Sequence, residues 1–168
     1  VNYFNKLDQP STIYIPDRKK EGYGPNTQGF NKLISEGSNL IFTVDCGTMS
    51  FDTINSLENK IDVIILDHHQ SEIKLPKAYS IINPNRIDDD SNLNYLCAAG
   101  VSFMTLVSIN ALLRKSNWYL DNNIQEPNLL DYLDLVSLGT ICDVVPLVGL
   151  NRAIVKQGLK IINKKKNI

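Results

Sequence analysis

Two nearly continuous apolar segments, separated by a helix-length stretch, constrain the fold of this chain more than any other feature. The first is "NLIFTVDCG" at 39–47 and the second is "DVIILD" at 62–67. Apolar runs of this length are typical of strands buried on both faces of a parallel sheet. Parallel neighbours need a connection of a dozen or more residues. The segment "SFDTINSLENK" at 50–60 can supply it, because its apolar residues recur at helical spacing after a serine. The order predicts an α/β fold with a largely parallel sheet.

The remaining segments continue the alternation of strands and helices and then contain helices alone. Up to about residue 97 the apolar residues suit both strands and helices, and beyond it they suit helices alone. The further predicted elements are strands at 11–16 and 78–83 and helices at 27–37, 98–114, 129–143 and 151–163, with a polar linker at 117–128. We therefore expect residues 1–168 to form one domain, with an α/β part at 12–97 and a mainly helical part at 98–168.

Charge and cysteine content exclude several classes of protein. The formal net charge is −1, so no overall basic field favours nucleic acid, although local patches remain possible. No apolar run reaches the roughly 18–20 residues of a membrane span. Cys46, Cys97 and Cys142 are odd in number, far apart and without a CxxC pair, which is typical of reduced thiols. We expect a cytoplasmic protein with no membrane segment.

Acidic and histidine residues follow the two buried strands directly. Asp45 comes at the end of the first strand, and Asp67, His68 and His69 come at the end of the second; the two histidines are the only ones in the chain. Ligands bind beyond the carboxyl ends of parallel strands, so these side chains can converge in one crevice. Carboxylates with imidazole suit Mn²⁺, Mg²⁺, Fe²⁺ or Zn²⁺. Adjacent side chains on extended backbone point apart, so we expect one histidine to bind the metal and the other to contact an acid or the substrate.

A third acid, Asp143, lies in "LGTICDVVPL", between apolar residues on both sides. Burying a carboxylate without a partner is costly, and a metal ion would supply the partner. A single aspartate at a strand end usually caps a helix or forms a turn, and a single histidine is usually solvated or satisfied in the core. The combination with Asp45 and the D-H-H triplet favours a metal site over these explanations.

Six ordered blocks resemble a known family. They are "YIPDRKKEGYGPN", "FTVDCGT", "LDHHQ", "INPNR", "LCAAGVSF" and "LGTICDVVPLVGLNR", which together span roughly residues 12 to 160. D-H-H is the signature of the DHH phosphoesterase superfamily, and the order of all six resembles the RecJ family of bacterial single-stranded-DNA-specific exonucleases. The resemblance implies a 5′-to-3′ exonuclease of DNA repair and recombination. It also implies that Mn²⁺ or Mg²⁺ is bound, as two ions in the complete protein.

The resemblance also implies roles for individual residues. The implied metal ligands are Asp45, His68 and Asp143. His69 joins them as a catalytic residue, and Asp67 supports the site from behind. The residues implied to lie beside the nucleic acid are Arg18, Asn85, Arg86 and Arg152. The implied partners are single-stranded DNA, a helicase and a single-strand-binding protein.

The sequence departs from the family pattern in three places. No Asp-x-Asp-Gly motif, which supplies further metal ligands in the family, precedes residue 12. The downstream DHHA1-type and OB-type domains of the family are also missing. In addition, Leu150 stands where the family more often has glutamate. We therefore expect a piece of a longer protein, an incomplete DHH catalytic domain with little or no activity alone.

Two other functions remain open. One is a DHH-family phosphoesterase acting on short oligonucleotides, cyclic dinucleotides or pyrophosphate. The other is a non-catalytic nucleic-acid-binding relative that has lost the metal site. The "EGYG" and "GTICDVVPL" blocks favour the exonuclease over the first alternative, and the presence of Asp45, His68, His69 and Asp143 favours it over the second.

Overall fold

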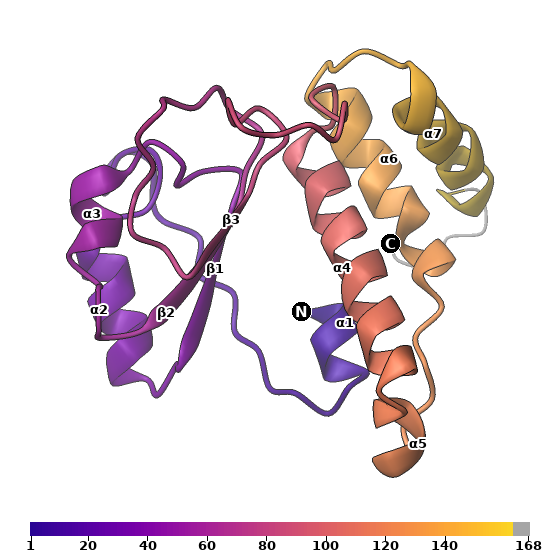
Figure 1. Ribbon diagram of the computed structural model, residues 1–168, viewed down its shortest axis with the longest axis horizontal. Helices are drawn as coiled ribbons and strands as arrows, with labels where there is room; N and C mark the ends of the chain where they lie inside the picture. The colour runs from indigo at the N-terminus through magenta and orange to yellow at the C-terminus, as the bar shows by residue number, and fades with distance from the viewer. Residues whose placement is uncertain (163–168) are drawn as a thin grey trace.

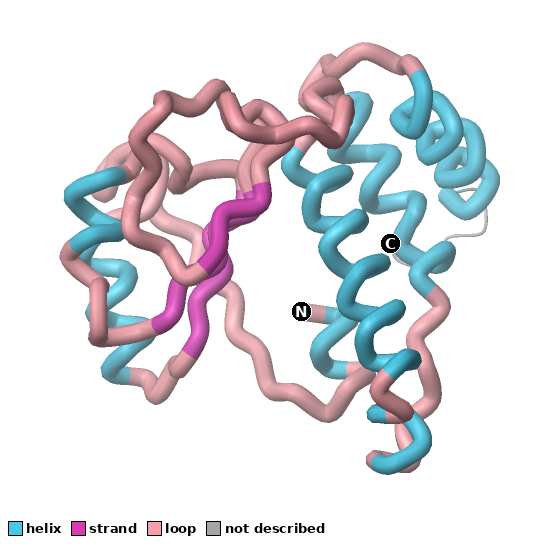
Figure 2. The backbone as a smooth tube through the Cα atoms, in the orientation of Figure 1, coloured by secondary structure: helices cyan, strands magenta, loops and turns pink. Residues whose placement is uncertain are grey.

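A three-stranded parallel sheet lies between two groups of helices in the computed structural model, which describes residues 1–162 (Figures 1 and 2). The strands are β1 (Leu40–Val44), β2 (Asp62–Leu66) and β3 (Ser80–Ile82), in the order β1-β2-β3. In the register, Leu40 pairs with Asp62 and Ile64 pairs with Ser80. All three carboxyl ends therefore meet at one edge, as the apolar runs predict. The α/β class is confirmed.

Two helices, α2 (Thr27–Ser35) and α3 (Phe51–Asn55), cover one face of the sheet, on the left of Figure 1. Alternate strand residues point to this face because side chains alternate along a strand. They form one buried cluster with the two helices. Its members are Phe30, Ile41, Ile54, Leu57, Val63 and Ile65.

The other face of the sheet meets the 18-residue helix α4 (Ala98–Lys115) and the short α1 (Asn2–Asn5). Leu66 at the end of β2 packs with Leu96 and Val101. This contact places the first turn of α4 next to the carboxyl ends of the strands. The N-terminal α1 reaches the same face, with the rings of Phe4 and Phe42 5.7 Å apart.

The mainly helical part follows from α4 onward. After α4 come α5 (Trp118–Asp121), the 3₁₀ helix η1 (Leu129–Tyr132), α6 (Leu133–Cys142) and α7 (Gly149–Ile162). Glycine lets α6 pack closely on α4: a Cβ added at Gly139 would lie 2.6 Å from the Cβ of Ala99. None of the helices within residues 1–162 is long and apolar enough to cross a membrane.

One predicted strand, at 11–16, is wrong. The segment is extended, but within residues 1–162 it pairs with no strand, and Ile13 and Ile15 are 65% and 83% exposed. Tyr14 is held by α2 and the loop before it, because its ring lies against Gly29 of α2 and its hydroxyl donates to Glu21. The apolar alternation here therefore reflects one anchored tyrosine between exposed residues.

The other expected elements are present with adjusted bounds. The helix expected at 50–60 ends at Asn55, and a turn follows in which Asn59 has a φ of +62°. The linker at 117–128 contains the short α5, which begins after Asn117, another left-handed residue. The helix expected at 129–143 begins as a 3₁₀ turn. The final residue of the last expected helix, 163, lies outside the described residues.

Candidate metal centre

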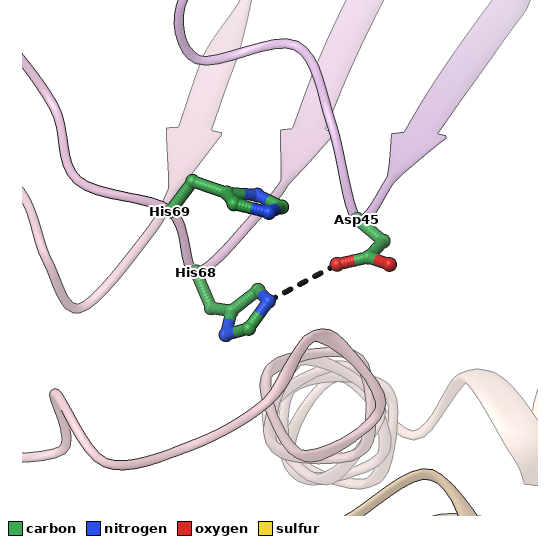
Figure 3. A group of neighbouring side chains, drawn as sticks. All are labelled: Asp45, His68 and His69. Atoms are coloured by element: carbon green, nitrogen blue, oxygen red, sulfur yellow. Dashed lines mark ion pairs between the residues drawn. The ribbon is translucent and has the colours of Figure 1, made fainter. Parts of the chain in front are cut away.

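The ends of β1 and β2 bring three potential ligands together (Figure 3). Asp45 directly follows β1, and its backbone N–H donates to the carbonyl of Leu66, 2.9 Å away. Its φ of +63° then turns the chain, a conformation that aspartate tolerates better than most residues. Nε2 of His68 lies 3.1 Å from Oδ1 of Asp45. Ligand atoms from Asp45, His68 and His69 all lie within 4.8 Å of one another.

Asp143 reaches the same place from the helical part. It directly follows α6, and its Oδ2 lies 3.5 Å from Nε2 of His68. The imidazole of His68, only 14% exposed, therefore lies beside two carboxylates, one from the sheet and one from a helix. Asp143 lies outside the compact group formed by Asp45, His68 and His69. The structure thus brings both predicted carboxylate ligands to the imidazole of His68 and adds a ligand atom of His69 within 4.8 Å of those of Asp45 and His68.

Asp67 is buried behind the histidines and is fully engaged. One oxygen accepts the backbone N–H of Thr48 (3.0 Å), and the other accepts the backbone N–H of His68 (2.8 Å) and Nδ1 of His69 (2.7 Å). Burial alone would raise the pKa of Asp67. The hydrogen bonds from His69 and Thr48 outweigh burial and lower the pKa to about 2. Asp67 is therefore a permanent carboxylate at neutral pH.

The orientation of His69 follows from this carboxylate. An ionised Asp67 can only accept, so Nδ1 of His69 must hold the proton between them. The opposite nitrogen, Nε2, faces the open side of the site, 3.5 Å from the hydroxyl of Tyr23. A carboxylate that fixes one ring nitrogen while the other stays available is the usual arrangement behind metal-binding and catalytic histidines.

A buried amide network holds the backbone of the two histidines. Nδ2 of Asn83 donates to the carbonyl of His69 (2.9 Å) and to Oγ1 of Thr48 (3.0 Å). Nδ2 of Asn85 donates to the carbonyl of His68 (2.5 Å). Asn85 thus supports the site from its backbone side. Asn83 and Thr48 were not expected from the sequence, although "INPNR" and "DCGT" stood among the resembling blocks.

The predicted nucleic-acid residues differ in their placement. Arg18 lies over the ring of Tyr23, 5.2 Å from its centroid, and the Tyr23 hydroxyl donates to the carbonyl of Asp45 (3.1 Å). Arg18 therefore reaches the edge of the site through Tyr23, a residue that the sequence reasoning did not single out within "EGYG". Arg86 is bound by the carboxylate of Asp88.

Arg152 is exposed on α7. Its side chain makes no hydrogen bond or ion pair within the part of the chain that the structure describes.

Neighbouring ionisable groups reveal a negative potential at the site. Burial first, and then the carboxylates of Asp67 and Asp45, together raise the pKa of Cys46 to about 11. Burial also raises the pKa of the Tyr23 hydroxyl, and Asp45 adds to the effect. Both shifts disfavour additional negative charge. A cation would complement this potential.

Comparison with known proteins identifies the family. Residues 1–140 match the family model described as "DHH family, N-terminal domain". The chain belongs to the DHH family. Among curated relatives, the single-stranded-DNA-specific exonuclease RecJ of Dickeya dadantii is 37% identical over 153 residues, which are 90% of this chain and 27% of that protein. RecJ of Escherichia coli is 38% identical, over 90% of this chain and 26% of that protein. The chain thus spans about a quarter of the relatives it matches.

Solved structures agree with this assignment. A crystal structure of exonuclease RecJ bound to manganese superposes with a TM-score of 0.76 at 34% identity, covering 95% of this chain and 38% of that one. RecJ of Thermus thermophilus in complex with Mn²⁺ superposes with a TM-score of 0.59, covering 80% of this chain and 19% of that one. The parallel sheet and its helices are therefore those of a DHH domain.

Proposed function

We propose that this chain is part of a 5′-to-3′ single-stranded-DNA exonuclease that hydrolyses phosphodiester bonds with Mn²⁺ or Mg²⁺. The observation that supports it most is the imidazole of His68 beside Asp45 and Asp143, at the carboxyl edge of a parallel sheet. The similarity to RecJ proteins, two of them solved with manganese, supports the same activity and metal. The chain would be an incomplete DHH catalytic domain, with an α/β metal-site part at 12–97 and a helical part at 98–168.

The donor set fits a divalent cation of this kind. Carboxylate oxygens with one or two imidazoles suit Mn²⁺, and carboxylates suit Mg²⁺. Asp45, His68 and Asp143 would hold the ion, and His69 would either join them or face the phosphate. Asp143 follows the last turn of α6. The partial negative charge at a helix C-terminus therefore adds to the attraction for a cation.

The bound metal would activate a water and neutralise charge on the phosphoryl oxygens. The protein residues then have distinct tasks. Asp67 fixes the Nδ1 proton of His69, which leaves Nε2 to bind the metal through its lone pair or, when it carries a proton of its own, to donate to an oxygen of the scissile phosphate. Tyr23 fixes the turn at Asp45 through the carbonyl. The cation of Arg18, which lies over the Tyr23 ring, would attract the phosphate backbone.

The cellular setting follows from this function and is part of the same proposal. The enzyme would work in the cytoplasm, in DNA repair and recombination. A helicase would supply the single strand, and a single-strand-binding protein would share it.

The decisive test is nuclease activity of the longer gene product that contains this chain. The substrate is 5′-labelled single-stranded DNA with Mn²⁺, beside a duplex of the same sequence. We expect release of nucleotides from the single strand only, and loss of at least about a hundredfold in rate for His68→Ala. Two aspartate variants form a matched pair. Asp45→Asn should lower the nuclease rate, whereas Asp62→Asn should not, because Asp62 is an exposed residue at the start of β2, away from the site.

Other outcomes would redirect the assignment. Release from dinucleotides or cyclic dinucleotides alone would make the protein a small-nucleotide phosphoesterase. Binding of single-stranded DNA without release in any metal would make it a non-catalytic relative.

A further inference from the structure

A polar cavity lies next to the metal centre, in the loop that connects β3 to α4. Its volume is about 360 Å³. Gln70, directly after His69, forms part of the wall, and Asn85, Asn92 and Asn94 form much of the rest. In Figure 1 this loop arches over the top of the molecule between the sheet and α4. The cavity is therefore outside the group of metal ligands but adjoins their backbone.

The charged residues in the wall are already engaged. The guanidinium of Arg86 donates from Nε to Oδ1 of Asp88 (2.9 Å), from Nη2 to Oδ2 of Asp88 (2.5 Å) and from Nη1 to the carbonyl of Ile81 (2.7 Å). The carboxylate of Asp89 accepts from the backbone N–H and hydroxyl of Ser91. Since the cation and the anion are both occupied, the cavity lacks the free charge that a phosphate requires.

The carboxamides, in contrast, have hydrogen-bonding groups without a partner. Within residues 1–162 the side chain of Asn94 has no hydrogen-bond partner, and the Asn92 side chain is bound only through its donor, to the carbonyl of Asp90. Gln70 likewise uses only its donor, to Asn85. A carboxamide presents a donor and an acceptor side by side, which is the pattern that pairs with the edge of a nucleobase.

Size and position narrow the class of ligand. A volume of about 360 Å³ is at the small end of the range for small-molecule pockets, so it suits one nucleoside. Pro84 and the exposed side chain of Ile87 add apolar surface for the face of a planar ring. Asn85 joins the wall to the metal centre, because its amide donates to the carbonyl of His68.

We propose that this cavity is a nucleobase pocket, which takes one base of a substrate strand through the carboxamides of Gln70, Asn92 and Asn94. It rests on the proposed function for its biological meaning, but base binding itself needs neither metal nor hydrolysis. The pocket recognises the neutral base, and the phosphate remains with the metal centre.

The test is an NMR titration of the 168-residue chain with deoxynucleosides in metal-free buffer. We expect saturable shifts of the side-chain amide signals of Gln70, Asn92 and Asn94. 2-Deoxyribose 5-phosphate, which has the sugar and phosphate but no base, should leave these signals unchanged. Gln70→Leu and Asn94→Leu should each weaken binding at least about fivefold. Gln157→Leu, a matched change at an exposed glutamine on α7, should leave it unchanged.

Three results would overturn the pocket. They are an absence of shifts at these amides up to the solubility limit of the deoxynucleoside, equal shifts with 2-deoxyribose 5-phosphate, and unchanged affinity in both Gln70→Leu and Asn94→Leu. The proposed function fails separately. Base binding here, combined with no hydrolysis by the longer protein in Mn²⁺, would leave a nucleoside-binding site in a protein that is not a nuclease.

Discussion

The sheet layer and the helical layer contribute to the candidate metal centre by different means. In the sheet layer, a buried polar network of Asp67, Thr48 and Asn83 fixes the histidines through hydrogen bonds. In the helical layer, Asp143 is positioned by α6, which packs on its neighbours through glycines at 139 and 158. The sheet layer therefore sets the protonation and orientation of the histidines through hydrogen bonds. The helical layer sets the position of Asp143 through the close packing of its helices.

The largest expected effect tests the helical layer. A Cβ at Gly158 would lie 1.7 Å from Oγ of Ser137 and 2.2 Å from the carbonyl oxygen of Leu133. Gly158→Ala should therefore force α7 away from α6 and lower the free energy of unfolding by about 3 kcal/mol in urea denaturation. Gln157→Ala, an exposed neighbour, should change it by less than about 0.5 kcal/mol. A Gly158→Ala protein as stable as wild type would show that close packing does not hold this layer.

The next effect tests the polar network of the sheet layer. Asp67→Asn removes the buried charge that accepts from Thr48, His68 and His69, and should cost about 2 kcal/mol at pH 7. The folded-state pKa of Asp67, about 2, is below its ordinary 3.8. The stabilisation is therefore complete above about pH 4 and is lost as the pH falls from there toward 2.

This pH dependence is measured by urea denaturation of both proteins between pH 2 and 7. The difference between wild type and Asp67→Asn should shrink as the pH falls. Asp62→Asn, at an exposed aspartate, serves as the control. A difference that stays constant over this range would mean that the charge of Asp67 does not stabilise the fold.

A third prediction asks whether a metal joins the two layers. If Asp45 and Asp143 hold one ion, Mn²⁺ should raise the unfolding temperature of the wild-type chain, since a ligand at a hundred times its Kd stabilises by about 2.7 kcal/mol. Asp45→Asn and Asp143→Asn should each weaken Mn²⁺ binding at least about tenfold, as measured by calorimetry. If only Asp45→Asn weakens it, the helical layer takes no part in binding.

The smallest effect concerns the turn that follows Asp143. Val144 is 87% exposed and has a φ of +56°, a left-handed conformation that strains a β-branched residue. Val144→Gly should relieve this strain and raise the free energy of unfolding by about 0.5–1 kcal/mol, because the flexibility of glycine offsets part of the gain. Val148→Gly, an exposed valine without a positive φ, should be neutral or destabilising. A loss of stability in Val144→Gly would show that the turn is not strained.

The order of strands and helices could be read from the sequence because it depends on local patterns. The apolar runs of β1 and β2 and the helical spacing of α3 stay the same whichever partners they meet. The segment at 11–16 shows the limit of this reasoning. Its alternation suits a strand, but Tyr14 packs on Gly29 of α2 and donates to Glu21, and the backbone of the segment does not pair with a strand.

The sequence by itself determined where the candidate ligands lie along the chain. Asp45 and the D-H-H triplet follow buried strands, and parallel strands bring their carboxyl ends to one edge. Only the tertiary structure decided what each side chain does there. In the fold, Arg86 donates to Asp88, and the amide of Asn85 donates to the carbonyl of His68. The hydroxyl of Tyr23 lies beside Asp45 and His69. The physical reason is that a hydrogen bond needs a partner within about 3 Å, and residues far apart in the sequence come that close only when the chain has folded.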